Sequence, residues 1–266
     1  MSSNNLLLSR SGKTPIEIAT QAAKEAGEIL VDRFTSNKTI KQKGRGNLVT
    51  EVDALSEKLV LDLLNTEYPQ HLVLSEETHF STSVAGYTWI VDPLDGTNNY
   101  VFGIPHFCVN IALVYNDEIL LGITYDPMKK ELFHAEKGKG AYLNSVSLRV
   151  SQIGLLKDSS IGFDLGYNDA EGKNMLDIAN KLWGRVHCMR MMGSAALGLA
   201  YVACGRISLY FHRFIYPWDI ASGILLVREA GGEVVDWQGK QVGFRSEKLI
   251  ASNKLLYEQF ISDTLA

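Results

Sequence analysis

The chain has 266 residues, with 26 Lys and Arg against 30 Asp and Glu, so its formal net charge is -4. This balance argues against a protein that binds nucleic acid mainly by neutralising phosphates. Hydrophobic residues make up 46% and charged residues 21%, which excludes a disordered chain and provides enough apolar surface for a core. We expect one domain over residues 1–266, with two lobes at roughly 1–150 and 151–266.

No apolar run approaches the roughly 20 residues that a membrane-spanning helix needs, and residues 1–13 lack the pattern of a signal peptide. We therefore expect a cytoplasmic protein with no membrane partner. Cys108, Cys188 and Cys204 are widely spaced among apolar residues, so we expect buried thiols without disulfides or zinc.

The N-terminal part of the chain predicts two amphipathic helices. Thr14 is a good N-cap, Pro15 suits the first helical position and Glu17 completes a capping box, so a helix should run to about Phe34. Asp53 begins a second helix, whose apolar face repeats at helical spacing. Strand-like runs separated by turn residues follow at 72–74, 88–91, 109–115, 119–125 and 132–136.

Beyond residue 150, helix and strand patterns alternate. Apolar periodicity predicts helices at 176–183, 195–204 and 220–230, and strands at 207–211 and 233–236. Hairpin-like spacing in the first half and alternation in the second half indicate layers of mixed helix and sheet, with strands paired in both directions.

The most informative motif is Asp92-Pro93-Leu94-Asp95-Gly96-Thr97, which directly follows an apolar run. Two carboxylates stand three residues apart, with a proline fixing the backbone between them and a glycine permitting a tight turn after them. Carboxylates that converge raise each other's pKa unless a cation lies between them, and Mg2+ prefers oxygen ligands. Taken alone, the motif is better explained as an ordinary turn, because Asp-Pro and Asp-Gly are common turn residues.

Further carboxylates occur where other expected elements begin or end. Glu76 and Glu77 follow the strand at 72–74, Asp53 opens a helix, and Asp219 lies in the segment 217–223. Each alone has an ordinary explanation as a helix cap or a solvated loop residue. Their recurrence at element ends predicts one shared cation site.

In this order, two motifs resemble those of the inositol monophosphatase family, within the wider group of metal-dependent, lithium-sensitive sugar phosphatases. The family patterns Asp-Pro-Leu/Ile-Asp-Gly-Thr and Trp-Asp-x-Ala-Gly/Ser-Gly are matched by residues 92–97 and 218–223, and the spacing fits from about Ile16 to Val235. The resemblance implies an α+β fold, a layered α-β-α-β-α sandwich with mixed sheets. It also implies a homodimer and Mg2+ as the cofactor, with about two to three ions per site.

By the same resemblance, the first ion would be held by Glu76, Asp92 and the backbone carbonyl of Leu94. The second ion would be held by Asp92, Asp95 and Asp219. Hydrolysis of a phosphate monoester requires an activated water and a stabilised leaving oxygen, which two metal ions can divide between them.

A weaker third ion would lie near Asp53 and Glu76. Thr97 would orient the attacking water through a relay with Asp53, and Glu76 would also serve that water. Backbone N–H groups of Gly96 and Thr97, if they open a helix or turn, would help to bind the phosphate.

Two positions depart from the family pattern. His212 stands where members that favour inositol phosphates commonly have Glu, and Ser75 replaces the usual Gly before the acidic pair. If His212 lines the pocket, it and Arg213 would favour a second anionic group, more so below pH ~6.5; otherwise His212 is an ordinary packed residue. The residues expected to contact substrate are Asp95, Gly96, Thr97, Gly193, Ser194, Ala195, His212 and Asp219.

The leading hypothesis is a Mg2+-dependent phosphatase of a small phosphorylated polyol or sugar, with inositol 1-phosphate as the first candidate. Fructose 1,6-bisphosphate, NADP and 3'-phosphoadenosine 5'-phosphate are alternative substrates. A hypothesis of another class is a regulatory or binding protein on the same fold. A short charged loop with Lys41, Lys43 and Arg45 is ordinarily just solvated, although it could lie beside the site and steer anions.

Overall fold

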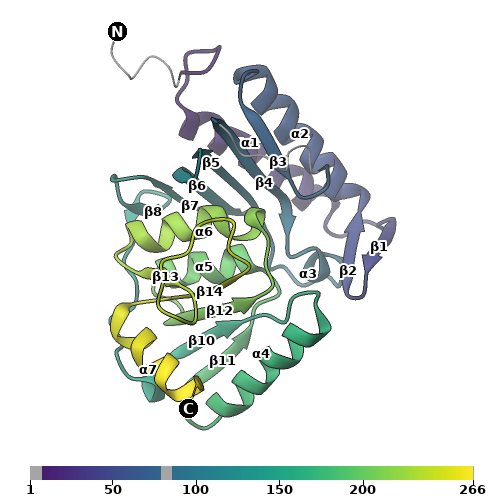
Figure 1. Cartoon of the computed structure of the whole chain (residues 1–266). Helices are drawn as coiled ribbons and strands as arrows, with labels where there is room; N and C mark the ends of the chain where they lie inside the picture. Colours follow the sequence, from purple (N-terminus) through teal and green to yellow (C-terminus); the bar gives the residue numbers. More distant parts are fainter. Residues whose placement is uncertain (1–7, 79–85, 266) are drawn as a thin grey trace.

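The structure, a computed structural model, describes residues 8–78 and 86–265. Its elements stack in five layers, which Figure 1 shows from top to bottom. Helices α1 (Pro15–Arg33) and α2 (Glu51–Glu67) form the first layer, and α5 (Ala195–Ala203) and α6 (Pro217–Glu229) form the third. Helices α4 (Asp169–Leu182) and α7 (Lys254–Leu265) form the fifth. The expected layered α-β-α-β-α sandwich is confirmed.

A seven-stranded sheet forms the second layer. Only its β3–β4 pair is parallel; every other neighbouring pair in it is antiparallel. The strands lie in chain order: β3 (Leu72–Ser75), β4 (Tyr87–Asp95), β5 (Cys108–Tyr115), β6 (Glu118–Asp126), β7 (Glu131–Glu136), β8 (Ala141–Leu143) and β9 (Val146–Ser147).

A five-stranded mixed sheet forms the fourth layer. Its strands lie in the order β11 (Cys188–Met191), β10 (Ser160–Phe163), β12 (Leu209–Arg213), β14 (Lys248–Ser252) and β13 (Glu233–Val235). A hairpin of β1 (Ile40–Gly44) and β2 (Asn47–Thr50), the short helix α3 (Thr97–Val101) and the 3-10 turn η2 (Leu156–Asp158) complete the described elements.

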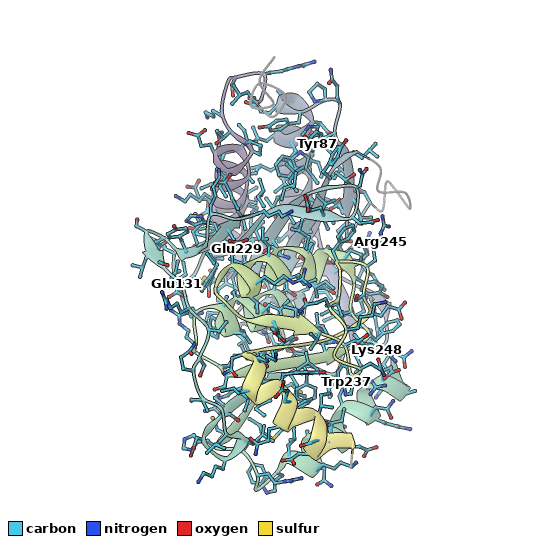
Figure 2. The ribbon with its side chains drawn as sticks, turned by 60° about the vertical axis from the view of Figure 1, so that its left-hand side comes forward. Tyr87, Glu131, Glu229, Trp237, Arg245 and Lys248 are labelled. Atoms are coloured by element: carbon cyan, nitrogen blue, oxygen red, sulfur yellow. The ribbon has the colours of Figure 1, made fainter. Side chains whose placement is uncertain are left out.

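Both faces of the larger sheet are covered, so its central strands are apolar without alternation. Along β4, Ile90 packs toward α5 and α6, whereas Trp89 and Val91 pack toward α1 and α2. At the far edge, Glu229 at the end of α6 accepts the backbone N–H groups of Gly138 and Gly140, each at 2.8 Å; Glu229 is labelled in Figure 2. These contacts tie the turn between β7 and β8 of the larger sheet to α6.

Several element boundaries differ from the prediction. Strand β4 continues to Asp95, because a bulge keeps its end paired to β5. The predicted strand at 207–211 is β12, which begins and ends two residues later. The strands β10, β11 and β14 were not predicted, since short apolar runs carry little periodicity. Cys108 is buried as expected, whereas Cys188 and Cys204 are half-buried. Within the described ranges, no helix is long and apolar enough to cross a membrane.

Close packing between β6 and α6 yields a stability prediction. A Cβ atom on Gly122 would lie 2.6 Å from the Cα atom of Ser222, so Gly122→Ala should lower the free energy of unfolding by about 1–3 kcal/mol. Urea denaturation measures this loss. Gly243→Ala is the matched control, because a Cβ there meets nothing within 4 Å. An equal effect of the two substitutions would contradict the packing argument.

Candidate metal and active site

Three carboxylates converge between the larger sheet and α6. Asp92 and Asp95 lie at the end of β4, Asp219 lies in the first turn of α6, and one oxygen of each falls within 4.8 Å of the others. Asp92 and Asp95 are buried and Asp219 is half-buried. The cluster therefore joins two segments that are more than a hundred residues apart in the chain.

The local sequence at the end of β4 directs its two carboxylates to one side. The pairing with β5 shifts between Asp92 and Asp95, and the N–H of Leu94 donates to Asp92 Oδ1 at 2.9 Å. Gly96 follows with φ +94°, and a Cβ there would lie 3.1 Å from the carbonyl oxygen of His106. Only glycine fits this turn without strain.

Asp53 and Thr97, which the family resemblance pairs, lie within hydrogen-bond distance of each other. Asp53 is the third residue of α2 and accepts hydrogen bonds from Thr50, which completes the capping box. The hydroxyl of Thr97 lies 3.0 Å from Asp53 Oδ1 and 3.0 Å from the carbonyl oxygen of Leu94, so it can donate to either. Both side chains are buried.

Glu76 reaches the site from the turn after β3. Lys43 of the β1 strand lies 3.3 Å from Glu76 and 2.6 Å from Glu77, so the charged loop does border the site. The turn is held by buried Glu57, whose Oε1 accepts the N–H of Glu77 at 3.2 Å and the hydroxyl of Ser75. Ser75 at the usual glycine position thus has a defined partner.

The first turn of α5 fixes the orientation of Asp95. Its Oδ2 accepts the hydroxyl of Ser194 at 2.5 Å and the N–H of Ala196 at 2.9 Å. Negative charge is stabilised at this position by the helix N-terminus. Since these bonds use Oδ2, the Oδ1 atom is left for the acidic cluster.

The electrostatics of the cluster fit a hard cation. Burial raises the pKa of Glu76 to about 7, against the effect of Lys43. Burial raises the pKa of Asp92 well above its ordinary value, and the charges of Glu76, Asp95 and Asp219 add to the shift. An all-oxygen donor set with mutual repulsion is the chemistry that a divalent ion such as Mg2+ offsets.

Two adjoining cavities open at the cluster. One, of about 190 Å³, is lined by the acidic residues and Lys43. The other, of about 500 Å³, shares Asp95, Thr97 and Asp219 with the first and extends to the second sheet. Its further lining residues include Asp164, Tyr167, Met191, Gly193, Ser194, Ala195, His212, Phe214 and Tyr216.

His212 lines the larger cavity, but not as the charged group that the sequence suggested. Burial lowers the pKa of His212 to about 4, so the ring is neutral at neutral pH, and its buried Nδ1 has no partner among the described residues. Arg213 points the other way, because side chains alternate along β12. Its Nε donates to Glu171 at 2.7 Å and its guanidinium lies over the ring of Trp237, which Figure 2 labels. The expectation of a basic His212–Arg213 pair was wrong.

The structure brings all the candidate residues to one place. Glu76, Asp92, Leu94, Asp95, Gly96, Thr97 and Asp219 line the smaller cavity; Gly193, Ser194, Ala195 and His212 line the larger one; and Asp53 lies behind Thr97. Sequence reasoning missed Glu57, Asp164, Tyr167 and Tyr216. Of these four residues, only Glu57 could have been predicted from the sequence, since it stands four residues after Asp53 and so lies on the same helix face.

Comparisons with known proteins give one family over nearly the whole chain. The family described as "Inositol monophosphatase family" matches residues 13–265. Inositol monophosphatase 2 of Solanum lycopersicum is 39% identical over 93% of this chain and 96% of its own length. Nus factor SuhB of Xylella fastidiosa is 38% identical over 91% of this chain and 90% of its own length. The structure of the extragenic suppressor protein suhB from Bartonella henselae superposes with a TM-score of 0.88, at 35% identity, over 94% of this chain and 97% of that one.

Proposed function

Since the chain belongs to the inositol monophosphatase family, we propose that it is a Mg2+-dependent phosphatase of a small phosphorylated polyol or sugar, with inositol 1-phosphate as the first candidate. The observation that carries this proposal is the convergence of Asp92, Asp95 and Asp219 beside the Asp53–Thr97 pair. A site that had lost catalysis would be expected to lose at least one member of this set.

The proposed ligands of the ions are the residues that the family resemblance implies. Glu76, Asp92 and the carbonyl of Leu94 would hold one ion, and Asp92, Asp95 and Asp219 a second; Asp53 and Glu76 would hold a weaker third. When bound, Mg2+ supplies positive charge to the phosphoryl and leaving oxygens and lowers the pKa of water.

The protein's own groups support the chemistry around the ions. Asp53 Oδ1 can accept a hydrogen bond from the Thr97 hydroxyl. The Thr97 oxygen is then free to accept a hydrogen bond from a water molecule and to orient that water. Gly96 is the N-cap and Thr97 the first residue of the short helix α3, and their N–H groups would serve phosphate oxygens in this proposal. Lys43 adds a positive charge at the rim of the cavity.

The larger cavity is the proposed site of the leaving group. Gly193, Ser194 and Ala195 would contact the substrate from one side and His212 from another. A neutral imidazole offers one donor and one acceptor in place of a carboxylate, so selectivity for a ring with many hydroxyls should be loose.

His212→Glu should shift the ratio of kcat/KM values toward inositol 1-phosphate and away from a bisphosphate substrate. A charge-assisted hydrogen bond to a ring hydroxyl is worth about 1.5–3 kcal/mol, or roughly 10- to 150-fold. Because the pKa of His212 is about 4, the wild-type ratio should not change between pH 6 and pH 8 through this residue. Arg213→Gln is the control, since that side chain lies outside the cavity. Equal ratios in wild type and His212→Glu would show that His212 does not contact the leaving group.

Released phosphate from a panel of substrates tests the proposed activity. The panel comprises inositol 1-phosphate, fructose 1,6-bisphosphate, NADP and 3'-phosphoadenosine 5'-phosphate, each measured in Mg2+ and then with excess chelator. Metal-dependent release from at least one substrate is expected, and no release from any of them would contradict the proposal.

Lithium should inhibit the reaction, whereas sodium at the same ionic strength, the control, should not. The family resemblance implies that Li+ takes a metal position while product phosphate is bound. Full activity in high lithium would show that the metal site differs in detail from that of the family.

A second candidate function is a regulatory or binding role on the same fold. It is favoured by the relatives named Nus factor SuhB, one of which is 38% identical to this chain. A regulatory role of this kind can coexist with phosphatase activity on the same fold. The net charge of -4 favours a protein partner over direct nucleic-acid binding. Homodimer formation and a cytoplasmic location complete the proposal, and light scattering at several concentrations measures the first of these.

A further inference from the structure

The turn before α5 is held from both sides by side chains that the proposed chemistry does not use. Asp164, at the end of β10, accepts the N–H of Gly193 on Oδ1 at 2.5 Å and the hydroxyl of Tyr210 on Oδ2 at 2.9 Å. Asn99 of α3 donates from Nδ2 to three carbonyls, those of His106 at 2.8 Å, Met192 at 3.1 Å and Gly193 at 3.2 Å, so it joins the Gly193 turn to the segment before β5. Gly193 is therefore hydrogen-bonded at its backbone N–H by Asp164 and at its carbonyl by Asn99.

This turn leads directly to the contacts that orient a proposed metal ligand. Ser194, the next residue, donates to Asp95 Oδ2, and so does the N–H of Ala196. Gly193 has φ +68°, and a Cβ there would lie 2.7 Å from Asn99 Nδ2, so the turn and the Asn99 side chain are in tight contact. A shift of Gly193 would move Ser194 and Ala196 away from Asp95.

Burial of the Asp164 carboxyl costs free energy. It is 8% exposed, and burial raises its pKa to about 7, with the charge of Asp95 adding to the shift despite two hydrogen bonds. A carboxyl that served only to fill space here could be replaced by an apolar side chain with less penalty. Its two oxygens instead connect Tyr210 on the second sheet to Gly193, whose neighbour Ser194 contacts the carboxylate cluster at Asp95.

We propose that Asp164 and Asn99 are positioning residues, which clamp the Gly193 turn and thereby fix the Asp95 carboxylate for metal binding. This inference rests on the proposed metal-dependent function and extends it to two residues outside the ligand set. Groups that orient metal ligands in this way typically change metal affinity by 10- to 100-fold when removed.

Isothermal titration of Mg2+ into metal-stripped protein tests the clamp without relying on turnover. Asp164→Ala should raise the Kd for Mg2+ about 10-fold or more, and Asn99→Ala should raise it as well. Asp164→Asn keeps an oxygen acceptor for the Gly193 N–H, so its Kd should stay within about 3-fold of wild type. Asp236→Ala is the matched control, because that carboxylate accepts two backbone N–H groups of its own loop at 2.9 Å and lines neither cavity.

The Mg2+ affinities of these variants distinguish a positioning role of Asp164 and Asn99 from a purely structural one. A wild-type Kd in both Asp164→Ala and Asn99→Ala would overturn the clamp, even if their melting temperatures fall, because that is the pattern of a purely structural role. Asp164→Asn as weak as Asp164→Ala would also overturn it, since charge and not the bond to Gly193 would then matter. Should Asp164→Ala not fold, Asn99→Ala alone decides. No Mg2+ binding by the wild-type protein would overturn the proposed function itself.

Discussion

Asp92→Asn is expected to reduce phosphate release by at least about 10³-fold at saturating Mg2+, and to raise the melting temperature of the metal-free protein. Asp92 is buried, and its charge is opposed by Glu76, Asp95 and Asp219. An uncharged amide removes this repulsion and keeps an oxygen for the N–H of Leu94. Because removal of an unpaired buried charge stabilises by about 1 kcal/mol or more, the melting temperature should rise by roughly 2–4 °C.

Asp177→Asn is the matched control for this substitution, since Asp177 lies on α4 and lines only a separate small cavity near Trp237. Its activity and melting temperature should stay near those of wild type. Loss of activity in Asp92→Asn together with a lower metal-free melting temperature would show a structural role for Asp92, contrary to the metal-ligand assignment.

The second large effect concerns pH. A carboxylate whose pKa is higher in the folded protein than in the unfolded chain stabilises the fold at low pH, and this stabilisation is lost as pH rises through the folded value. For Glu76 that window runs from its ordinary 4.5 to about 7, and the raised pKa values of Asp92, Asp95 and Asp219 act in the same direction. The metal-free cluster is therefore least favourable at alkaline pH.

The gain in melting temperature on adding Mg2+ isolates this effect. Half-buried His71 and buried His212 have pKa values lowered to about 4 by burial, so they destabilise the fold at acidic pH, but they do so with and without metal. Mg2+ should raise the melting temperature by little at pH 5 and by about 5 °C or more at pH 8. Differential scanning fluorimetry with Mg2+ or chelator measures both values. The same gain at both pH values would contradict the proposed cation site.

Local sequence predicted the turn that carries the central carboxylates, and the family resemblance assigned those carboxylates to a metal site. One short segment holds Asp92, Asp95 and Gly96. Its proline, its glycine and the preceding apolar strand leave the backbone few alternative conformations. Asp53 was also predictable, because a capping box places its carboxylate at a helix start. The five-layer fold followed from the family resemblance rather than from periodicity.

What could not be predicted depends on contacts between distant segments. Glu57 supports the Glu76 turn only because α2 lies beside β3, and Asp164 reaches Gly193 only because β10 and the start of α5 are neighbours. The neutral state of His212 follows from its burial on β12, which no local pattern reports. Tertiary packing, and not residue type, decides these roles.

We propose that the carboxylate cluster holds the Mg2+ on which hydrolysis depends. The most direct test of this claim is a Mg2+ titration of the metal-stripped protein in which bound metal and phosphate release from inositol 1-phosphate, or from the best substrate of the panel, are followed together. We predict that both rise over the same Mg2+ range, that chelator reverses both, and that Asp92→Asn loses both. Full hydrolysis in excess chelator, or saturable Mg2+ binding with no phosphate released from any substrate, would contradict the claim.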